Sequence, residues 1–183
     1  MDTLLADPFR EALRAACELP LEELFARRSA ELWPAFERGE LDEATYWARW
    51  ADDGIVVDPD AFHRARRAGT RWLPGMRELL GELDGRALRV AASNYPVWIE
   101  EVTAEHLDGL VDRVVASHHL GVRKPDPVFF VRLLDTLEVA APQAVFVDDR
   151  QVNVDAAEEL GIESHRFVDA PTLRAWLVDT GVL

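Results

Sequence analysis

The chain has 183 residues and a formal net charge of -14 at pH 7, with 49% hydrophobic and 30% charged residues. A chain this acidic lacks the positive surface that binds nucleic acid or an anionic membrane, so we expect neither partner. Its one cysteine, Cys17, excludes an internal disulfide, and no apolar run reaches the roughly eighteen residues of a membrane span. We therefore expect a cytoplasmic protein, whose oligomeric state the sequence leaves open.

The first third of the chain has apolar residues at helical spacing. Helices are predicted from Phe9, after Pro20, over 32–36, after an N-cap at Asp42, and from Pro59 to the residues before Gly69. This segment also holds or adjoins four of the six tryptophans: Trp33, Trp47, Trp50 and Trp72. Packing is the favoured role for each of them, although stacking on an aromatic substrate is an alternative.

From Pro74 onward, predicted helices and strands alternate. Strands are expected over 87–92, 114–116, 144–147 and 164–168, and helices over 75–83, 97–107, 127–137, 152–160 and 171–177. Short apolar strands separated by helices predict an α/β fold, in which helices cover both faces of a parallel sheet.

Polar residues follow three of these strands. Ser93 ends the first, Lys124 follows the second through a loop, and Asp148-Asp149 ends the third. Lys124 is the only lysine in a chain with nineteen arginines; an ammonium is a compact point charge that suits phosphate or carboxylate. Parallel sheets bind ligands at the carboxyl ends of their strands, and two adjacent carboxylates suit a hard cation, Mg2+ above all.

With Ser93-Asn94, Lys124-Pro125 and Phe146-Val147-Asp148-Asp149 in this order, the chain resembles the haloacid dehalogenase-like (HAD) hydrolases over essentially its whole length. The resemblance implies a Rossmann-like parallel core built from residues 1–6 and 74–183. It implies a helical cap over residues 7–73, which closes over the site and selects the substrate. Segments 1–9 and 93–98 are similar to flavin mononucleotide hydrolase-like members.

The resemblance also implies a metal site. Asp149 would bind Mg2+ directly, Asp148 would lie behind it or orient the lysine, and the backbone carbonyl of Met1 would be a further ligand. Asn153 either supports this shell or lies on a helix surface.

A substrate-binding set follows from the same resemblance. Ser93 would donate a hydrogen bond to a phosphoryl oxygen, Asn94 would assist through its backbone, and Lys124 would neutralise charge on the nucleophile and the phosphate. Such a site catalyses in-line phosphoryl transfer by positioning and electrostatic stabilisation.

The first motif of the family, Asp-x-Asp-x-Thr, is incomplete. Placing Thr3 on its threonine puts Met1 at the acid/base position and the nucleophilic Asp two residues ahead of the chain. The first strand, which is central in this fold, is missing as well, so we expect a split sheet with unpaired backbone groups. Either Met1 is an internal residue of a longer natural chain, which we favour, or the protein is truncated and inactive. In either case we expect the 183 residues to turn over little or no substrate.

The expected function is that of a Mg2+-dependent phosphatase acting on a small phosphorylated metabolite through an aspartyl-phosphate. One alternative is a metal-independent 2-haloacid dehalogenase; Met1 in place of the second motif-one Asp favours it, and the acidic pair at 148–149 argues against it. Another is a non-catalytic binding protein on the same scaffold.

Overall fold

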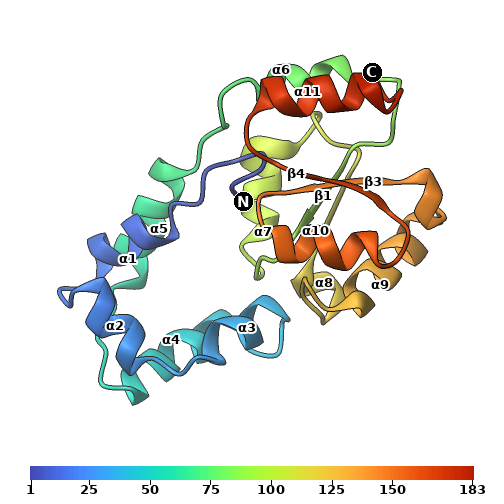
Figure 1. Ribbon diagram of the computed structural model, residues 1–183. Helices are drawn as coiled ribbons and strands as arrows, with labels where there is room; N and C mark the ends of the chain where they lie inside the picture. The colour runs from blue at the N-terminus through green and yellow to red at the C-terminus, as the bar shows by residue number, and fades with distance from the viewer.

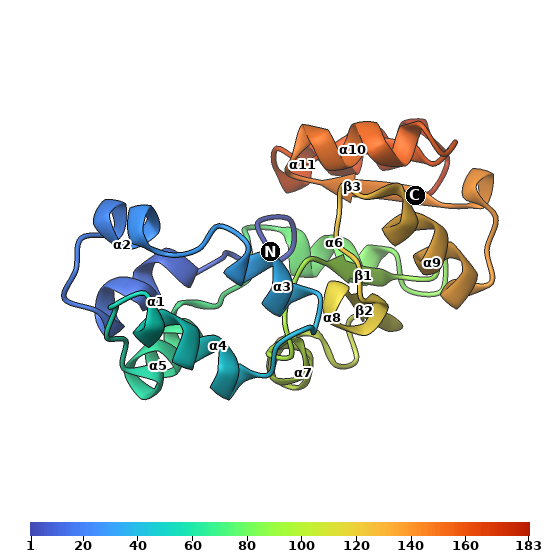
Figure 2. The ribbon, with the colours of Figure 1, turned by 90° about the horizontal axis from the view of Figure 1, so that it is seen from below.

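Five helices make up the N-terminal part of the protein, whose structure is a computed structural model describing residues 1–183. They are α1 (Phe9–Ala16), α2 (Leu21–Arg27), α3 (Leu32–Glu37), α4 (Glu43–Asp52) and α5 (Pro59–Gly69). The Asp42 carboxylate accepts a hydrogen bond from the Thr45 backbone N–H at 2.7 Å, which confirms the predicted N-cap of α4. Figures 1 and 2 show these helices grouped to one side of the strands; the cap boundaries at 7 and 73 stay a prediction.

The remaining elements alternate as expected. The strands are β1 (Val90–Ser93), β2 (Arg113–Ala116), β3 (Val145–Asp148) and β4 (Glu163–Arg166). The helices are α6 (Met76–Glu82), α7 (Ile99–Val102), a π-helical turn η1 (Thr103–Leu107), α8 (Ser117–Leu120), α9 (Pro127–Leu137), a 3-10 turn η2 (Ala141–Gln143), α10 (Gln151–Glu158) and α11 (Ala170–Asp179). The short helix α8 was not predicted.

The first strand begins later than predicted. We expected it from Ala87, but the ladder starts at Val90, opposite Arg113. Just before it, the backbone N–H of Arg89 donates to the Asp112 carboxylate at 2.8 Å instead of to a neighbouring strand. The side chain of Asp112 thus takes the place of a ladder partner and sets where pairing begins.

The strands form two separate parallel pairs, β1 with β2 and β3 with β4. Their registers run from Val90↔Arg113 to Ser93↔Ala116 and from Val145↔Glu163 to Asp148↔Arg166. No strand joins β1 to β3, which confirms the expected split of the sheet. Each of these two strands therefore has a hydrogen-bonded neighbour on one edge only.

A cavity of about 220 Å3 adjoins β1 and β3; we call it the strand gap. Of its 27 lining residues 22 are hydrophobic, including Ala91 of β1, Phe146 of β3, Leu79 of α6 and Leu173 of α11. Met1 lines it too. Protein interiors contain few voids larger than a water molecule, so a cavity of this size marks a place where packing is incomplete.

Trp98 is the aromatic side chain of the strand region that contacts most of the aromatic residues of the helical part. Trp33 and Trp47 lie 5.9 and 6.0 Å from it between ring centroids, and Trp50 is completely buried in the same cluster. Packing, the role favoured from sequence, is thus what these three side chains do. No helix of the protein is both long enough and apolar enough to cross a membrane.

Candidate active site

Lys124 lies at the centre of the site, in the loop between α8 and α9. Its side chain is buried, and Nζ lies 2.7 Å from Oδ2 of Asp148 and donates to the carbonyl of Ala92 at 2.8 Å. One lysine therefore contacts the ends of both β1 and β3. The carboxyl ends of the two strand pairs meet here, as the strand-end pattern predicted.

Asp148 is the fully engaged member of the acidic pair. Besides Lys124, it accepts hydrogen bonds from the Arg150 backbone N–H at 3.0 Å and from Nδ2 of Asn153 at 2.8 Å. Burial acts to raise the pKa of Asp148, but the charge and hydrogen bond of Lys124 and the other two donors outweigh it, so the pKa is lowered. Asn153 is buried and holds Asp148, which excludes the helix-surface alternative.

Asp149, the second member of the acidic pair, differs from Asp148 in its hydrogen bonds and in the direction of its pKa shift. Its side chain is half-buried and accepts no hydrogen bond from another residue, and its pKa is raised, first by burial and then by the charge of Asp148. One carboxylate of the pair is neutralised by lysine, and the other remains available for a cation.

The donor set fits Mg2+ rather than a transition metal. No group of three or more His, Cys, Asp or Glu side chains converges anywhere in the protein. Mg2+ is commonly held by one or two carboxylates together with waters and substrate oxygens, so it does not need such a cluster.

Ser93 and Asn94 follow β1 at the same edge. The Asn94 side chain donates to the carbonyl of Lys124 and accepts from its backbone N–H, both at 2.8 Å. It thereby fixes the lysine loop against the end of β1. Ser93 is half-buried and lines the strand gap, and its hydroxyl makes no hydrogen bond within the protein. The hydroxyl is therefore free to donate to a ligand.

Met1 also belongs to this group. The pKa of its amino group is lowered, first by burial and then by the charge of Lys124, while the charges of Asp7, Asp2 and Asp149 act in the opposite direction. The start of the chain thus lies within electrostatic reach of the lysine and the acidic pair. All six residues predicted for the site are brought into one neighbourhood.

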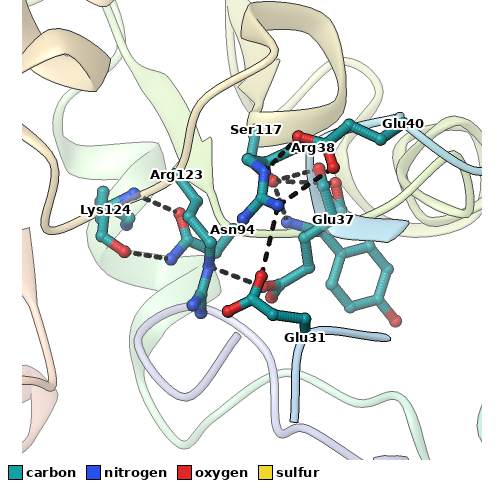
Figure 3. A network of polar contacts seen from close by, with 9 residues as sticks. Glu31, Glu37, Arg38, Glu40, Asn94, Ser117, Arg123 and Lys124 are labelled. Atoms are coloured by element: carbon teal, nitrogen blue, oxygen red, sulfur yellow. Dashed lines mark hydrogen bonds and ion pairs between the residues drawn. The ribbon is translucent and has the colours of Figure 1, made fainter. Parts of the chain in front are cut away.

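A second set of contacts, which no sequence pattern predicted, joins α3 to the same loops (Figure 3). The Ser117 hydroxyl donates to the carbonyl of Glu37 at 2.6 Å and accepts from the Tyr95 backbone N–H at 3.0 Å. The Glu37 carboxylate lies 2.8 Å from Nε of Arg123, the residue before Lys124. Helix α3 therefore contacts both the Asn94 turn and the lysine loop.

Comparison with known proteins gives one family and several relatives. The model of the haloacid dehalogenase-like hydrolases matches residues 4–161. The chain is 32% identical to the flavin mononucleotide hydrolase 1 of Arabidopsis thaliana, a chloroplast protein, over 100% of this chain and 75% of that protein. It is 38% identical to a phosphoglycolate phosphatase of Rhodospirillum rubrum, over 86% of this chain and 70% of that one.

A solved structure of a HAD family enzyme from Bacteroides thetaiotaomicron, a magnesium complex, superposes with a TM-score of 0.76. The match covers 92% of this chain and 88% of that one at 17% sequence identity. At that identity the likeness establishes the fold, a Rossmann-like α/β core with additional helices.

Proposed function

Because the chain belongs to the haloacid dehalogenase-like hydrolase family, we propose that it carries the site of a Mg2+-dependent phosphatase acting on a small phosphorylated metabolite. The observation that supports this most is the meeting of Lys124 with the ends of β1 and β3, beside the unengaged carboxylate of Asp149. Two relatives whose names describe hydrolysis of phosphorylated compounds agree with this chemistry.

The role proposed for each residue agrees with its place in the site. The free hydroxyl of Ser93 donates to a phosphoryl oxygen, and the ammonium of Lys124 offsets the negative charge of the phosphoryl group. Asp148 holds that ammonium in place, and Asn94 holds its loop. Asp149, with the backbone carbonyl of Met1, would hold Mg2+, which when bound neutralises charge on the phosphoryl oxygens.

The nucleophile is the component that these 183 residues lack in our proposal. The family pattern places it two positions ahead of Met1, on a strand that would run between β1 and β3, and the strand gap lies beside both of these strands. We therefore propose that the chain by itself turns over little substrate. A strand that fills the gap and ends in Asp would supply the attacking carboxylate.

The experiment is a substrate screen with a lengthened form, in which about six apolar residues, an Asp and one further residue precede Met1. Phosphate monoesters, flavin mononucleotide among them, are assayed with Mg2+ and with a chelator. Phosphate release that needs both the added Asp and Mg2+ supports the proposal. The matched control is the lengthened form with Asn in place of the added Asp, which should release no phosphate.

A 2-haloacid dehalogenase is the second candidate, because Met1 stands at the acid/base position. Halide release from a 2-haloacid by the lengthened form, unaffected by chelation and without phosphate release from any ester, would favour it. A lengthened form that binds phosphate and turns over neither substrate would indicate a binding protein. A cytoplasmic location stays a prediction, since one relative is a chloroplast protein.

A further inference from the structure

The ion pair between Glu37 and Arg123 links the helical part to the residue next to the central lysine. The Glu37 side chain is 4% exposed and that of Arg123 is 28% exposed. Burial raises the pKa of Glu37, and the nearby charge of Arg123 opposes this rise. A buried pair of this kind is a weak source of stability, because desolvation offsets its Coulomb attraction. Its clearer consequence is geometric, since it places the guanidinium of Arg123 against the Glu37 carboxylate.

The ion pair with Glu37 leaves the two terminal nitrogens of the Arg123 guanidinium without a hydrogen-bond partner. Nε of Arg123 is the atom that lies 2.8 Å from the Glu37 carboxylate, and neither terminal nitrogen of Arg123 makes a hydrogen bond within the protein. These two nitrogens form the planar edge that pairs with a carboxylate or phosphate through two parallel hydrogen bonds.

The position of this edge is set from two sides. The backbone of the next residue, Lys124, is held by the two hydrogen bonds of Asn94, and Glu37 is held through its carbonyl by Ser117. Figure 3 shows Arg123 between Glu37 and the loop of Asn94 and Lys124. The charge of Arg150, which follows the acidic pair, also reaches Glu37. Arg123 and Arg150 thus both act electrostatically on Glu37, and Lys124 is next to Arg123 in a chain whose net charge is -14.

We propose that Arg123, oriented by Glu37, is a specificity-determining residue that binds a second anionic group of the substrate. This rests on the proposed phosphatase function and narrows its substrate class. Preferred substrates are phosphate monoesters that carry a carboxylate or a second phosphate beyond the phosphoryl group held by Ser93 and Lys124. Glu37 is a positioning residue that acts through Arg123.

The test measures binding to the 183-residue chain by calorimetry in the presence of Mg2+. Three ligands with the same three-carbon unit are compared: propyl phosphate, its carboxylate analogue 3-phosphooxypropanoate, and propane-1,3-diyl bisphosphate. We expect the two doubly anionic ligands to bind roughly ten- to a hundredfold more tightly than propyl phosphate, the range of a charge-assisted hydrogen-bonded pair. The ligand with the larger gain in affinity over propyl phosphate shows whether Arg123 prefers a carboxylate or a phosphate.

Substitutions of Arg123 and Glu37 distinguish a loss of preference for doubly anionic ligands from a general loss of binding. Arg123→Gln should reduce this preference to about twofold or less while propyl phosphate still binds, and Arg123→Lys should keep only part of it because a point charge cannot bind bidentately. Glu37→Gln should lower the preference with little change for propyl phosphate. Arg77→Gln, an exposed arginine on α6, is the matched control and should behave as the original chain.

Two results would overturn the proposal. One is an original chain that binds all three esters with similar affinity. The other is an Arg123→Gln variant that weakens all three by the same factor, which is what a purely structural role predicts. If none of the esters binds with Mg2+ present, the phosphatase proposal itself fails, and the role of Arg123 fails with it.

Discussion

Nζ of Lys124 lies 2.7 Å from Oδ2 of Asp148, and both side chains are 6% exposed. The pair joins the lysine loop to the end of β3, while the second contact of the ammonium, with the Ala92 carbonyl, joins it to β1. These two contacts bridge strand pairs that no backbone ladder connects. Lys124 therefore holds the two strand pairs together, in addition to its place in the site.

The Lys124–Asp148 pair predicts a large stability effect. Lys124→Met leaves the carboxylate of Asp148 buried without its cation, and we expect the free energy of unfolding to fall by about 3–5 kcal/mol. Adding Asp148→Asn to this variant removes the uncompensated charge and should restore part of the loss. Urea titrations of the two single variants and the double variant measure the coupling. A loss below about 1 kcal/mol for Lys124→Met would contradict a dominant role for the pair.

The unequal environments of the acidic pair predict which acid binds Mg2+. Mg2+ at a hundred times its dissociation constant should stabilise the chain by about 2.7 kcal/mol, which thermal unfolding detects as a rise in Tm. Asp149→Asn should abolish this rise. Asp155→Asn, an exposed acid on α10, is the control and should leave it intact. A Mg2+-dependent rise that survives Asp149→Asn would place the ion elsewhere.

The strand gap predicts that the protein gains stability when the gap is filled. An apolar strand added ahead of Met1 would bury several side chains at about 1.5–3 kcal/mol each, and we expect the free energy of unfolding to rise by about 3 kcal/mol or more. Hydrogen exchange should slow at backbone amides of β1 and β3, which would gain partners. An extension of equal length made of Gly and Ser is the control. Equal stability of the two lengthened forms would show that the gap does not take a strand.

Glu43, at the start of α4, predicts a pH dependence of the helical part. Burial acts to raise the pKa of Glu43, but hydrogen bonds from His63 and Trp47 outweigh it and lower the pKa to about 2. Its ionised form is thus favoured in the folded state. The resulting stability is fully present above about pH 4.5 and is lost as the pH falls toward 2.

Glu43→Gln should therefore cost on the order of 1 kcal/mol at pH 7, since the side chain is partly exposed, and should reduce the acid sensitivity of unfolding. Urea titrations at pH 7 and pH 3 measure both effects. Glu22→Gln is the control, because Glu22 lies on α2 of the helical part, is exposed, and accepts no hydrogen bond through its carboxylate. An unchanged difference in stability between the two pH values in Glu43→Gln would contradict this account.

The meeting of Ser93, Lys124 and Asp148 was predictable because Ser93 and Asp148 end apolar strands and Lys124 follows such a strand through a loop. Their proximity could be predicted without any knowledge of side-chain contacts, since parallel strands bring their carboxyl ends to one edge of the sheet. The split of the sheet was predictable because residues 1–183 contain no counterpart of the first strand of the family. The start of β1 was not predictable from the sequence, because Asp112, a residue distant in the chain, decides where the ladder of β1 begins.

The contacts of α3 lay beyond sequence reasoning for a similar reason. Glu37 and Ser117 are 80 residues apart, and nothing in the local spacing of either residue indicates that they meet. For Asn153 the sequence left two alternatives open, support of the metal shell and a place on a helix surface, and only the position of its side chain against Asp148 decides between them. Pairs between distant segments leave no periodic signal, so the structure was needed to find them.

The most direct test of the account is the Mg2+-dependent hydrolysis of p-nitrophenyl phosphate by the 183-residue chain and by the form lengthened with a strand ending in Asp. We predict turnover only in the lengthened form, with a loss of about a hundredfold or more in its Lys124→Arg variant. Robust hydrolysis by the 183 residues alone, or a Lys124→Arg variant of full activity, would contradict it.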